Sequence, residues 1–127
     1  MSKPIFERLN KKLDTYVIEA GVTSGAAVAV STTPADLYGI HVINTNAADA
    51  YLNLYDLAAA TPTVGTTATK QTYLVPAAST STTVAGAIDL VLDNPIPFFT
   101  ALTYATVTVA GGATGPTIGL VINLRYK

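Results

Sequence analysis

Short runs of β-forming residues, separated by turn residues, follow one another from about residue 26 to the C-terminus. Leu37–Thr45 is rich in β-branched and aromatic residues. Tyr51–Tyr55 alternates, which places Leu52 and Leu54 on one face of a strand and the two tyrosines on the other. Short strands with regular turns favour an antiparallel sandwich or barrel. Eight strands are predicted in total, at Ala26–Ser31, Leu37–Thr45, Tyr51–Tyr55, Lys70–Val75, Thr82–Leu92, Ile96–Thr100, Thr103–Val109 and Ile118–Tyr126.

The strand count narrows the fold class. Eight is the number of strands in a jelly roll, although the count alone does not distinguish a jelly roll from an immunoglobulin-like sandwich. We therefore expect an all-β, antiparallel, jelly-roll-like β-sandwich of about eight strands. Asp93-Asn94-Pro95 is predicted to be a turn between two of them, because Asp and Asn bond their own backbone in turns. Three later runs alternate clearly enough to assign shared faces, with Ile88, Leu90 and Leu92 together, Ala105, Val107 and Val109 together, and Ile118, Leu120, Ile122 and Leu124 together.

The first 13 residues have a different pattern. Ile5, Leu9 and Leu13 recur every four residues and Phe6 widens their stripe, which predicts a short amphipathic helix. A helix of this length is unstable alone in water, so its apolar stripe must dock on the body or on a partner. The predicted organisation is a charged N-terminal helix or arm with a linker, residues 1–25, followed by a β-sandwich domain, residues 26–127.

Charge is distributed very unevenly along the chain. Seven of its fifteen Lys, Arg, Asp and Glu residues lie in the first 19 positions, and only 12% of the 127 residues are charged. An ordinary soluble domain is about 25% charged. A lone protein with so few charges has weak protection against self-association. The pattern therefore favours one subunit of a larger assembly, whose surface is partly covered by neighbours.

Several classes of protein are disfavoured by composition. The chain has no Cys, so it is not a disulfide scaffold. A net charge of −1, with aromatic residues that are not interleaved with Lys or Arg, argues against nucleic-acid binding. No segment is apolar for long enough to span a membrane. The N-terminus lacks the apolar core of a secretion signal, so synthesis in a cytosol is the expectation.

Residues suited to catalysis or metal binding do not form a recognisable motif. His41, the single histidine, lies within a predicted strand without nearby partners in the sequence. Asp89 and Asp93 are four residues apart, which on a strand separates them by roughly 13 Å. Nucleotide-binding, nucleophile-elbow and calcium-loop motifs are missing. We therefore expect no enzyme activity, no metal and no cofactor.

Tyrosines are frequent in the predicted strands. They could form a platform for carbohydrate, but Tyr is also enriched in strands and at protein interfaces, and the chain has no Trp. The interface interpretation is therefore preferred. The candidate subunit-interface residues are Tyr38, His41, Tyr51 and Tyr55.

Four segments occur in an order that resembles a family of small structural proteins of tailed bacteriophages. They are Leu37–Asp56, Thr61–Thr66, Asn94–Thr103 and Val121–Lys127, and the resemblance covers about residues 36–127. It implies a jelly-roll-like sandwich that assembles as a homotrimer on the outer capsid surface of a virion. The implied role is a decoration or cement protein that stabilises the phage head by bridging subunits of the major capsid protein. Similar sandwiches in tail, neck or head fibres leave an alternative open, a fibre domain that binds host-surface glycan.

The N-terminal arm is the part expected to reach the capsid. A segment that orders on binding wraps more surface than a rigid patch does. Deleting residues 1–19 is expected to leave a folded body that no longer attaches. The candidate capsid contacts are Ile5, Phe6, Arg8, Leu9, Lys12 and Leu13.

Overall fold

The computed structural model describes residues 27–78 and 85–127, together with the backbone of residues 14–20. No helix in this part of the chain is long and apolar enough to cross a membrane. The helix predicted within residues 1–13 and most of the predicted linker lie outside the described residues. Eight strands are present, β1 (Asp14–Ala20), β2 (Val28–Ser31), β3 (Ala35–Asn44), β4 (Ala50–Tyr55), β5 (Gln71–Val75), β6 (Gly86–Phe98), β7 (Leu102–Val107) and β8 (Leu120–Tyr126).

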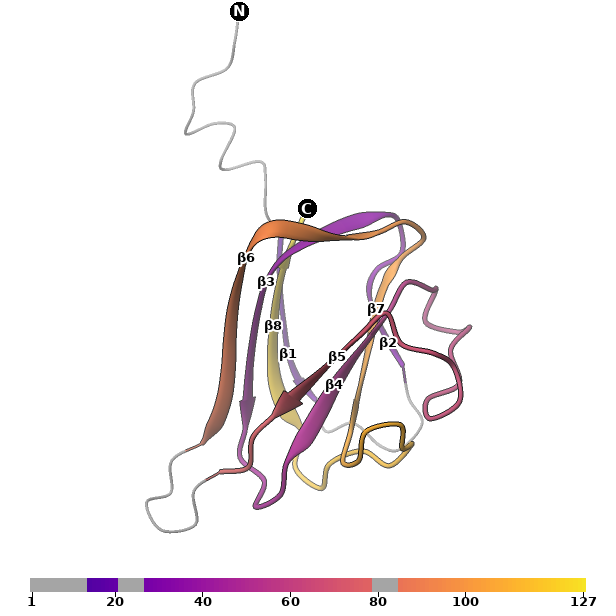
Figure 1. Ribbon diagram of the computed structural model, residues 1–127. Coiled ribbons are helices and arrows are strands. Elements are labelled where there is room, and N and C mark those ends of the chain that lie inside the picture. The colour runs from indigo at the N-terminus through magenta and orange to yellow at the C-terminus, as the bar shows by residue number, and fades with distance from the viewer. Residues whose placement is uncertain (1–13, 21–26, 79–84) are drawn as a thin grey trace, which may run out of the picture.

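The strands form two four-stranded antiparallel sheets that face each other (Figure 1). Sheet A has the order β1-β8-β3-β6, and sheet B has the order β2-β7-β4-β5. The pairing is nested, because β1 pairs with β8, β2 with β7, β3 with β6 and β4 with β5. A long hairpin folded over on itself in this way is a jelly roll. The expected all-β sandwich is therefore confirmed, and the strand order separates it from an immunoglobulin-like one.

Strand β1 shows that the β-sandwich domain begins earlier in the chain than residue 26, where it was predicted to begin. It pairs along its whole length with β8, from Asp14 opposite Tyr126 to Ala20 opposite Leu120. Residues 14–20 are therefore part of sheet A, whereas the sequence analysis assigned them to the arm and linker. The sequence DTYVIEA contains β-forming residues, but a charged amphipathic segment precedes it and glycines follow it. Only pairing with a distant strand, from Asp14 opposite Tyr126 to Ala20 opposite Leu120, establishes it as a strand.

Strand β6 corrects a second prediction. The runs Thr82–Leu92 and Ile96–Thr100 were expected to be separate strands with a turn at Asp93-Asn94-Pro95, but one strand continues through that turn. The register against β3 shifts here, from Val91 opposite Gly39 to Ile96 opposite Leu37. Such a bulge bends a strand, and β6 curves over the end of the sandwich at this point (Figure 1). The predicted turn is therefore wrong, and Asp93-Asn94-Pro95 lies at a bend within one strand.

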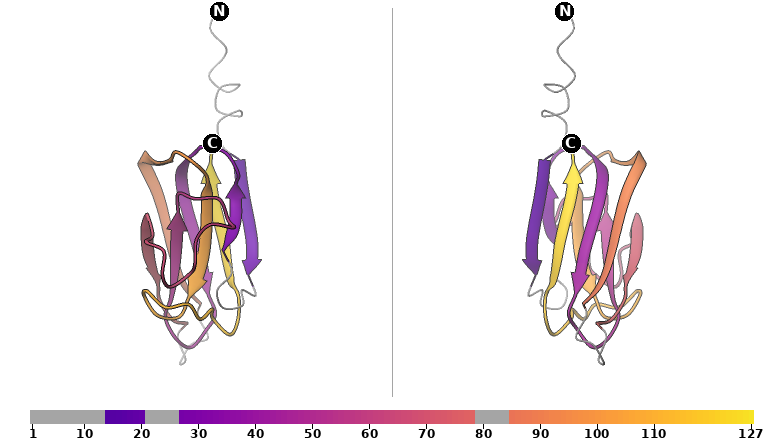
Figure 2. Two further views of the ribbon diagram at one scale, coloured as in Figure 1. Left: turned by 90° about the vertical axis from the view of Figure 1, so that its right-hand side faces the viewer. Right: turned by 90° about the vertical axis from the view of Figure 1, so that its left-hand side faces the viewer.

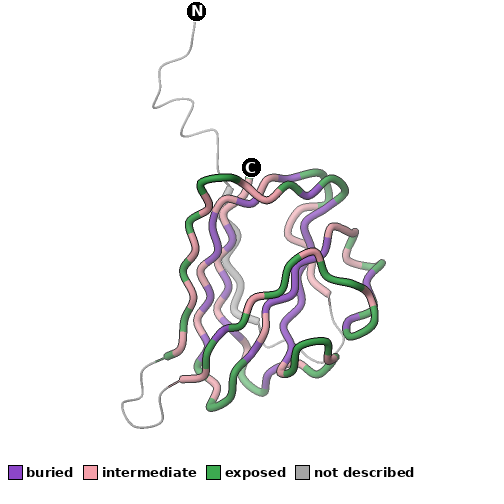
Figure 3. Tube along the Cα trace, viewed as in Figure 1, coloured by how far each residue is buried: buried purple, intermediate pink, exposed green. Residues whose placement is uncertain are grey.

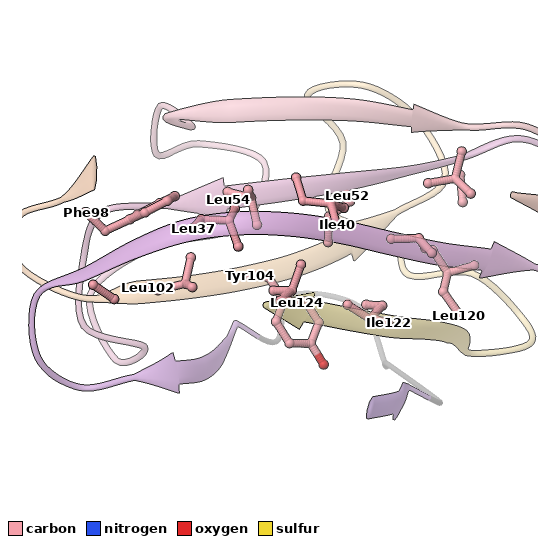
Figure 4. Close-up of a cluster of buried hydrophobic side chains, with 14 residues drawn as sticks. Leu37, Ile40, Leu52, Leu54, Phe98, Leu102, Tyr104, Leu120, Ile122 and Leu124 are labelled. Atoms are coloured by element: carbon pink, nitrogen blue, oxygen red, sulfur yellow. The ribbon is translucent and has the colours of Figure 1, made fainter. Parts of the chain in front are cut away.

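The core consists of rows of apolar side chains that cross sheet A. Leu90, Ile40 and Leu124 lie opposite one another in one row, and the row beside it is equally apolar. From sheet B, Leu52 and Leu54 project toward them, as the alternation of β4 predicted (Figure 4). The predicted inward face of β8 is confirmed for Leu120, Ile122 and Leu124, which are all fully buried.

The central strands are buried and the strands at one side of the sandwich are not. Figure 3 shows burial along β3, β8, β4 and β7, and alternating exposure along β5 and β6. Ile88, Leu90 and Leu92 share the inward face of β6, as predicted, but each is only half-buried. The reason is that β6 and β5 are the last strands of their sheets on the same side, so no further strand covers this opening.

Candidate interaction surfaces

The outer face of sheet B is covered by another part of the chain, and the outer face of sheet A is not covered by the described residues. The 15-residue connection between β4 and β5, residues 56–70, folds over the outer face of sheet B (Figure 2, left). Its Val64 is buried against Tyr55, Ala105 and Val107 in a second, smaller apolar cluster. The outer face of sheet A has no such cover among the described residues. Sheet A therefore offers the larger free surface to a partner.

This difference corrects the prediction for Tyr55. Its side chain is 1% exposed beneath the 56–70 connection, so it is part of the protein interior and cannot contact another subunit. Tyr51 lies beside it on the same face and is partly covered. Ala105 and Val107, which share a face as predicted, also turn to this cluster, while the inward residues of β7 are Leu102 and Tyr104.

The uncovered face of sheet A is a nearly flat grid. Three rows cross strands β6, β3 and β8, and residues directly opposite in a sheet point to the same side. Val91 is 73% exposed here, and Ile43 and Val121 are half-buried, so the face carries apolar side chains on both sides of a polar row. The rows are Val91, Gly39 and Arg125, then Asp89, His41 and Asn123, then Ala87, Ile43 and Val121.

Gly39, the middle residue of the first row, leaves room for the side chain of Arg125. A Cβ at this position would lie 2.6 Å from Nε of Arg125, so the guanidinium of Arg125 lies across the bare backbone of Gly39. The neighbouring Tyr38 stands at the register shift of β3 and is half-buried. A long cationic side chain can lie along a protein surface in this way while its charged group stays in contact with water.

His41 and Asp89 occupy the centre of this face. Nδ1 of His41 lies 3.7 Å from Oδ1 of Asp89, and both side chains are well exposed. A catalytic dyad needs a third group that orients the base, and Asn123, the opposite neighbour of His41 on β8, carries no charge. Within the described residues, no three His, Cys, Asp or Glu side chains are grouped as metal ligands. The pair is best suited to polar contact with a partner surface.

Asp56 fastens the end of the sandwich where β6 turns into β7. Its carboxylate accepts hydrogen bonds from the backbone N–H groups of Phe99, Thr100 and Ala101, at 2.9, 2.7 and 3.2 Å. Lys70 Nζ lies 3.8 Å from the carboxylate. Burial pushes the pKa of Asp56 up, but the three N–H donors and the charge of Lys70 outweigh it, so the pKa lies below its ordinary value.

Two aromatic rings hold Lys70 in this position. Its Nζ lies 5.2 Å from the centre of the Phe98 ring and 5.1 Å from that of Phe99. A cation over an aromatic face is attracted by the electrons of the ring. The sequence analysis placed Lys70 at the start of a predicted strand and assigned no role to Asp56, and nothing in their spacing indicates that they meet over a third segment. The contacts of Asp56 and Lys70 thus join the two ends of the 56–70 connection to the β6–β7 turn.

The opposite end of the sandwich is organised by two asparagines. The buried side-chain amide of Asn44 donates to the carbonyls of Ala48, Val75 and Pro76. Its oxygen accepts hydrogen bonds from the backbone and side chain of Asn46. These contacts join the β3–β4 turn to the end of β5, and they make use of the whole hydrogen-bonding capacity of the Asn44 amide.

Asn46 extends the network to the segment before β8. Its side chain donates to the carbonyl of Ile118 and accepts from the N–H of the same residue, so it imitates a paired strand. A hollow of about 320 Å³ lies beside it, between Asn46 and Pro116. Val109 and Ile118 are exposed at this end of the molecule. No local pattern in the sequence indicates this arrangement, because its partners come from three loops.

The N-terminal candidates cannot be placed on a surface. Ile5, Phe6, Arg8, Leu9, Lys12 and Leu13 lie outside the described residues. Their point of attachment is nevertheless clear, because Asp14 is opposite Tyr126 in sheet A. The segment therefore joins the sandwich beside its C-terminus, at the end closed by Phe98 and Asp56.

Comparisons with protein-family models and with curated proteins found no match for this chain. Its geometry and the resemblance of its sequence segments are therefore what bears on its role. The geometry is that of a small β-sandwich with one uncovered sheet face, and the resemblance is to small structural proteins.

Proposed function

We propose that this protein is a non-enzymatic structural protein of a phage virion, a decoration or cement protein on the outer capsid surface. It binds the major capsid protein and stabilises the head by bridging capsid subunits. The observation that carries the proposal is the uncovered outer face of sheet A, on a jelly-roll body that has few charges and covers its other outer face itself. The resemblance noted above supports the same role.

Self-association, as the homotrimer that the resemblance implies, would use this uncovered face. Tyr38 and His41, two of the four predicted interface residues, lie on it or at its border. Tyr51 lies on the opposite outer face, and Tyr55 is interior. The interface is therefore centred on His41 and Val91, with the exposed valine supplying apolar area at about 25 cal/mol per Å² buried.

A charge substitution on the face tests this arrangement. Val91→Lys adds an ammonium group to the proposed contact, in the same row of the face as Arg125, and burying an additional charge in a contact is costly. The matched control is Val109→Lys, since Val109 is 63% exposed against 73% for Val91 but lies near the other end of the molecule. We expect the wild type and Val109→Lys to have the mass of a trimer, and Val91→Lys that of a monomer. A trimer in all three proteins would exclude the face as the subunit contact.

Attachment is tested by deleting residues 1–13. The longer deletion of residues 1–19 would also remove most of β1 and leave the edge of β8 bare, so it would confuse unfolding with loss of attachment. We expect the shorter deletion to keep a folded sandwich and to lose saturable co-sedimentation with expanded capsids. The full chain should bind those capsids saturably and raise their resistance to heat.

Two outcomes would contradict the proposal. Equal capsid occupancy of the full and shortened chains would exclude the N-terminal segment as the anchor. A full chain that ignores capsids and binds host cells would indicate the alternative function, a tail, neck or head-fibre domain that binds glycan.

A further inference from the structure

A second hollow lies beneath the 56–70 connection, on the outer side of sheet B. It measures about 250 Å³, which is the share of liquid volume of about eight water molecules. Its floor is formed by Asn53 and Tyr55 of β4, and Gly65 and Gly111 approach it from two different loops. The remaining lining is almost entirely hydroxyl-bearing, with Thr66, Thr67, Thr69 and Thr72 beside Ala68.

Gly65 is required where these loops meet. Its φ is +90°, in the region that favours glycine, and a Cβ would lie 3.0 Å from that of Ala113. Val64, the residue before it, is buried and anchors the connection to sheet B. The 56–70 connection is therefore held at one side by Val64 and stands away from the sheet beside it, where the hollow is.

The donor and the acceptor can be assigned in each of the hydrogen bonds that join Asn53, Thr72 and Thr69. Oδ1 of Asn53 can only accept, so the hydroxyl of Thr72, 3.0 Å away, must donate to it. Thr72 has then used its single proton, so Thr69, whose hydroxyl is 2.9 Å from that of Thr72, must be the donor in that pair. The oxygen of Thr69 is thereby left as an acceptor at the rim of the hollow.

A donor stands at the rim as well. The hydroxyl oxygen of Thr67 accepts the backbone N–H of Thr63 at 2.9 Å, which orients the side chain and leaves its proton to be donated elsewhere. The rim thus presents one oriented acceptor and one oriented donor. Adjacent hydroxyl groups of a ligand can each accept and donate, so they match such a pair.

No charge lies in this hollow. Its lining contains no Asp, Glu, Lys, Arg or His. Tyr55 is its one ionisable side chain, and burial raises the pKa of that phenol, with the nearby Asn53 side chain opposing the shift, so it is neutral at physiological pH. Asn53 is 2% exposed, so the polar floor is held in place by the protein interior.

We propose that this hollow, the threonine pocket formed by Asn53, Thr67, Thr69 and Thr72, is a binding site for a neutral carbohydrate of one sugar ring. A sugar presents adjacent hydroxyls and no charge, and one ring suits the volume of the pocket. The site is independent of capsid binding, because it lies on the opposite outer face from the sheet A grid and does not involve residues 1–13. A structural protein that carried it would also contact surface glycans.

The test is a titration of the isotope-labelled full chain, followed by backbone NMR shifts. The probes are D-glucose, D-galactose, D-mannose and N-acetyl-D-glucosamine, with D-glucuronate as a charged probe and glycerol as an unspecific polyol. We expect at least one neutral sugar to give saturable shifts confined to residues 53–55 and 65–72. Glucuronate and glycerol should give none that saturate in the same range.

Three variants make the result specific. Thr69→Val removes the rim acceptor without touching the Thr72–Asn53 bond, and Thr72→Val breaks the chain of hydroxyls itself. Each should weaken sugar binding by about tenfold or more, the equivalent of one hydrogen bond. The matched control is Thr117→Val, an exposed threonine that lines the other hollow, and it should bind like the wild type. If Thr72→Val fails to fold, Thr69→Val alone decides the outcome.

Several results would overturn the proposal. These are no saturable shift with any neutral sugar, shifts centred on Asn46 and Pro116, binding of glucuronate alone, or equal affinity of Thr69→Val and the wild type. None of them bears on capsid attachment, which is measured by sedimentation. The two proposals can therefore fail separately.

Discussion

Replacing Asp56 tests how the end of the sandwich is held together. Asp56→Ala removes three hydrogen bonds from the backbone of the β6–β7 turn. The N–H groups of the exposed Phe99 and Thr100 can bond to water instead, whereas Ala101 is buried and its N–H stays unsatisfied. A buried group left without a partner costs about 1–3 kcal/mol, and a hydrogen bond to a charged acceptor contributes about 1.5–3 kcal/mol. We expect the free energy of unfolding to fall by about 2–4 kcal/mol.

Asp56→Asn removes the charge of the side chain but keeps its shape, so it separates the two contributions to stability. The amide keeps an oxygen for Thr100 and Ala101 but points an N–H at the N–H of Phe99, so it should cost less than alanine while losing the attraction of Lys70. Because the pKa of Asp56 is lowered in the folded state, its carboxylate stabilises the protein above the unfolded pKa of about 3.9. This contribution is lost as the pH falls through the lower folded pKa. The stability difference between the wild type and Asp56→Asn should therefore shrink below about pH 4.

Urea unfolding at a series of pH values measures both effects. The matched control is Asp93→Asn, an exposed carboxylate on β6, and it should change stability by less than about 0.5 kcal/mol. If Asp56→Ala unfolds within 0.5 kcal/mol of the wild type, the carboxylate does not fasten the turn. A difference between Asp56→Asn and the wild type that persists unchanged in acid would refute the electrostatic part of the reasoning.

Three further predictions concern the body of the sandwich, and urea unfolding measures each of them. Gly86→Ala should lower the free energy of unfolding by more than about 2 kcal/mol, because its Cβ would overlap the backbone carbonyl of Pro76. Gly39→Ala should lower it by less than about 1 kcal/mol, because the new Cβ would meet only the movable end of Arg125. Equal costs of the two substitutions would contradict this reasoning. Leu124→Ala should lower the free energy of unfolding by about 2–5 kcal/mol, because Leu124 is a fully buried core residue. The control Val91→Ala, at an exposed position, should lower it by less than about 0.5 kcal/mol. A small effect at Leu124 would mean that the core is loosely packed. Asn44→Ala should cost about 1–3 kcal/mol because it leaves the buried carbonyl of Val75 unpaired, while the exposed Asn94→Ala serves as the neutral control.

Local pattern alone located most of the strands. β3, β4, β7 and β8 begin and end within about two residues of the predicted runs, because alternation and β-branched residues report directly on a half-buried pleated surface. The faces of β4 were also predicted correctly, with Leu52 and Leu54 turned to the main core and the tyrosines to the other side. The predicted total of eight strands is the observed total, but two differences cancel in it, since β1 was missed and two predicted strands are one in β6.

The candidate surfaces were much less accessible to sequence reasoning. Tyr51 and Tyr55 alternate with the core residues as a solvent-facing pair would, and nothing local indicates that Val64 covers them. The threonine pocket brings together β4, the following connection and Gly111, so its residues share no motif. The same holds for Asp56, whose three donors lie more than 40 positions further along the chain.

The amino-acid sequence by itself determined that this chain forms short antiparallel strands, which residues of each strand are apolar on one face, and that the body carries very little charge. These are local properties, set by the side chains of neighbouring residues. Tertiary structure alone decided that β1 joins β8, that β6 bends where a turn was expected, and which outer face remains bare. The physical reason is that nested pairing joins strands from opposite ends of the chain, and the free energy of such contacts depends on partners that no local window contains.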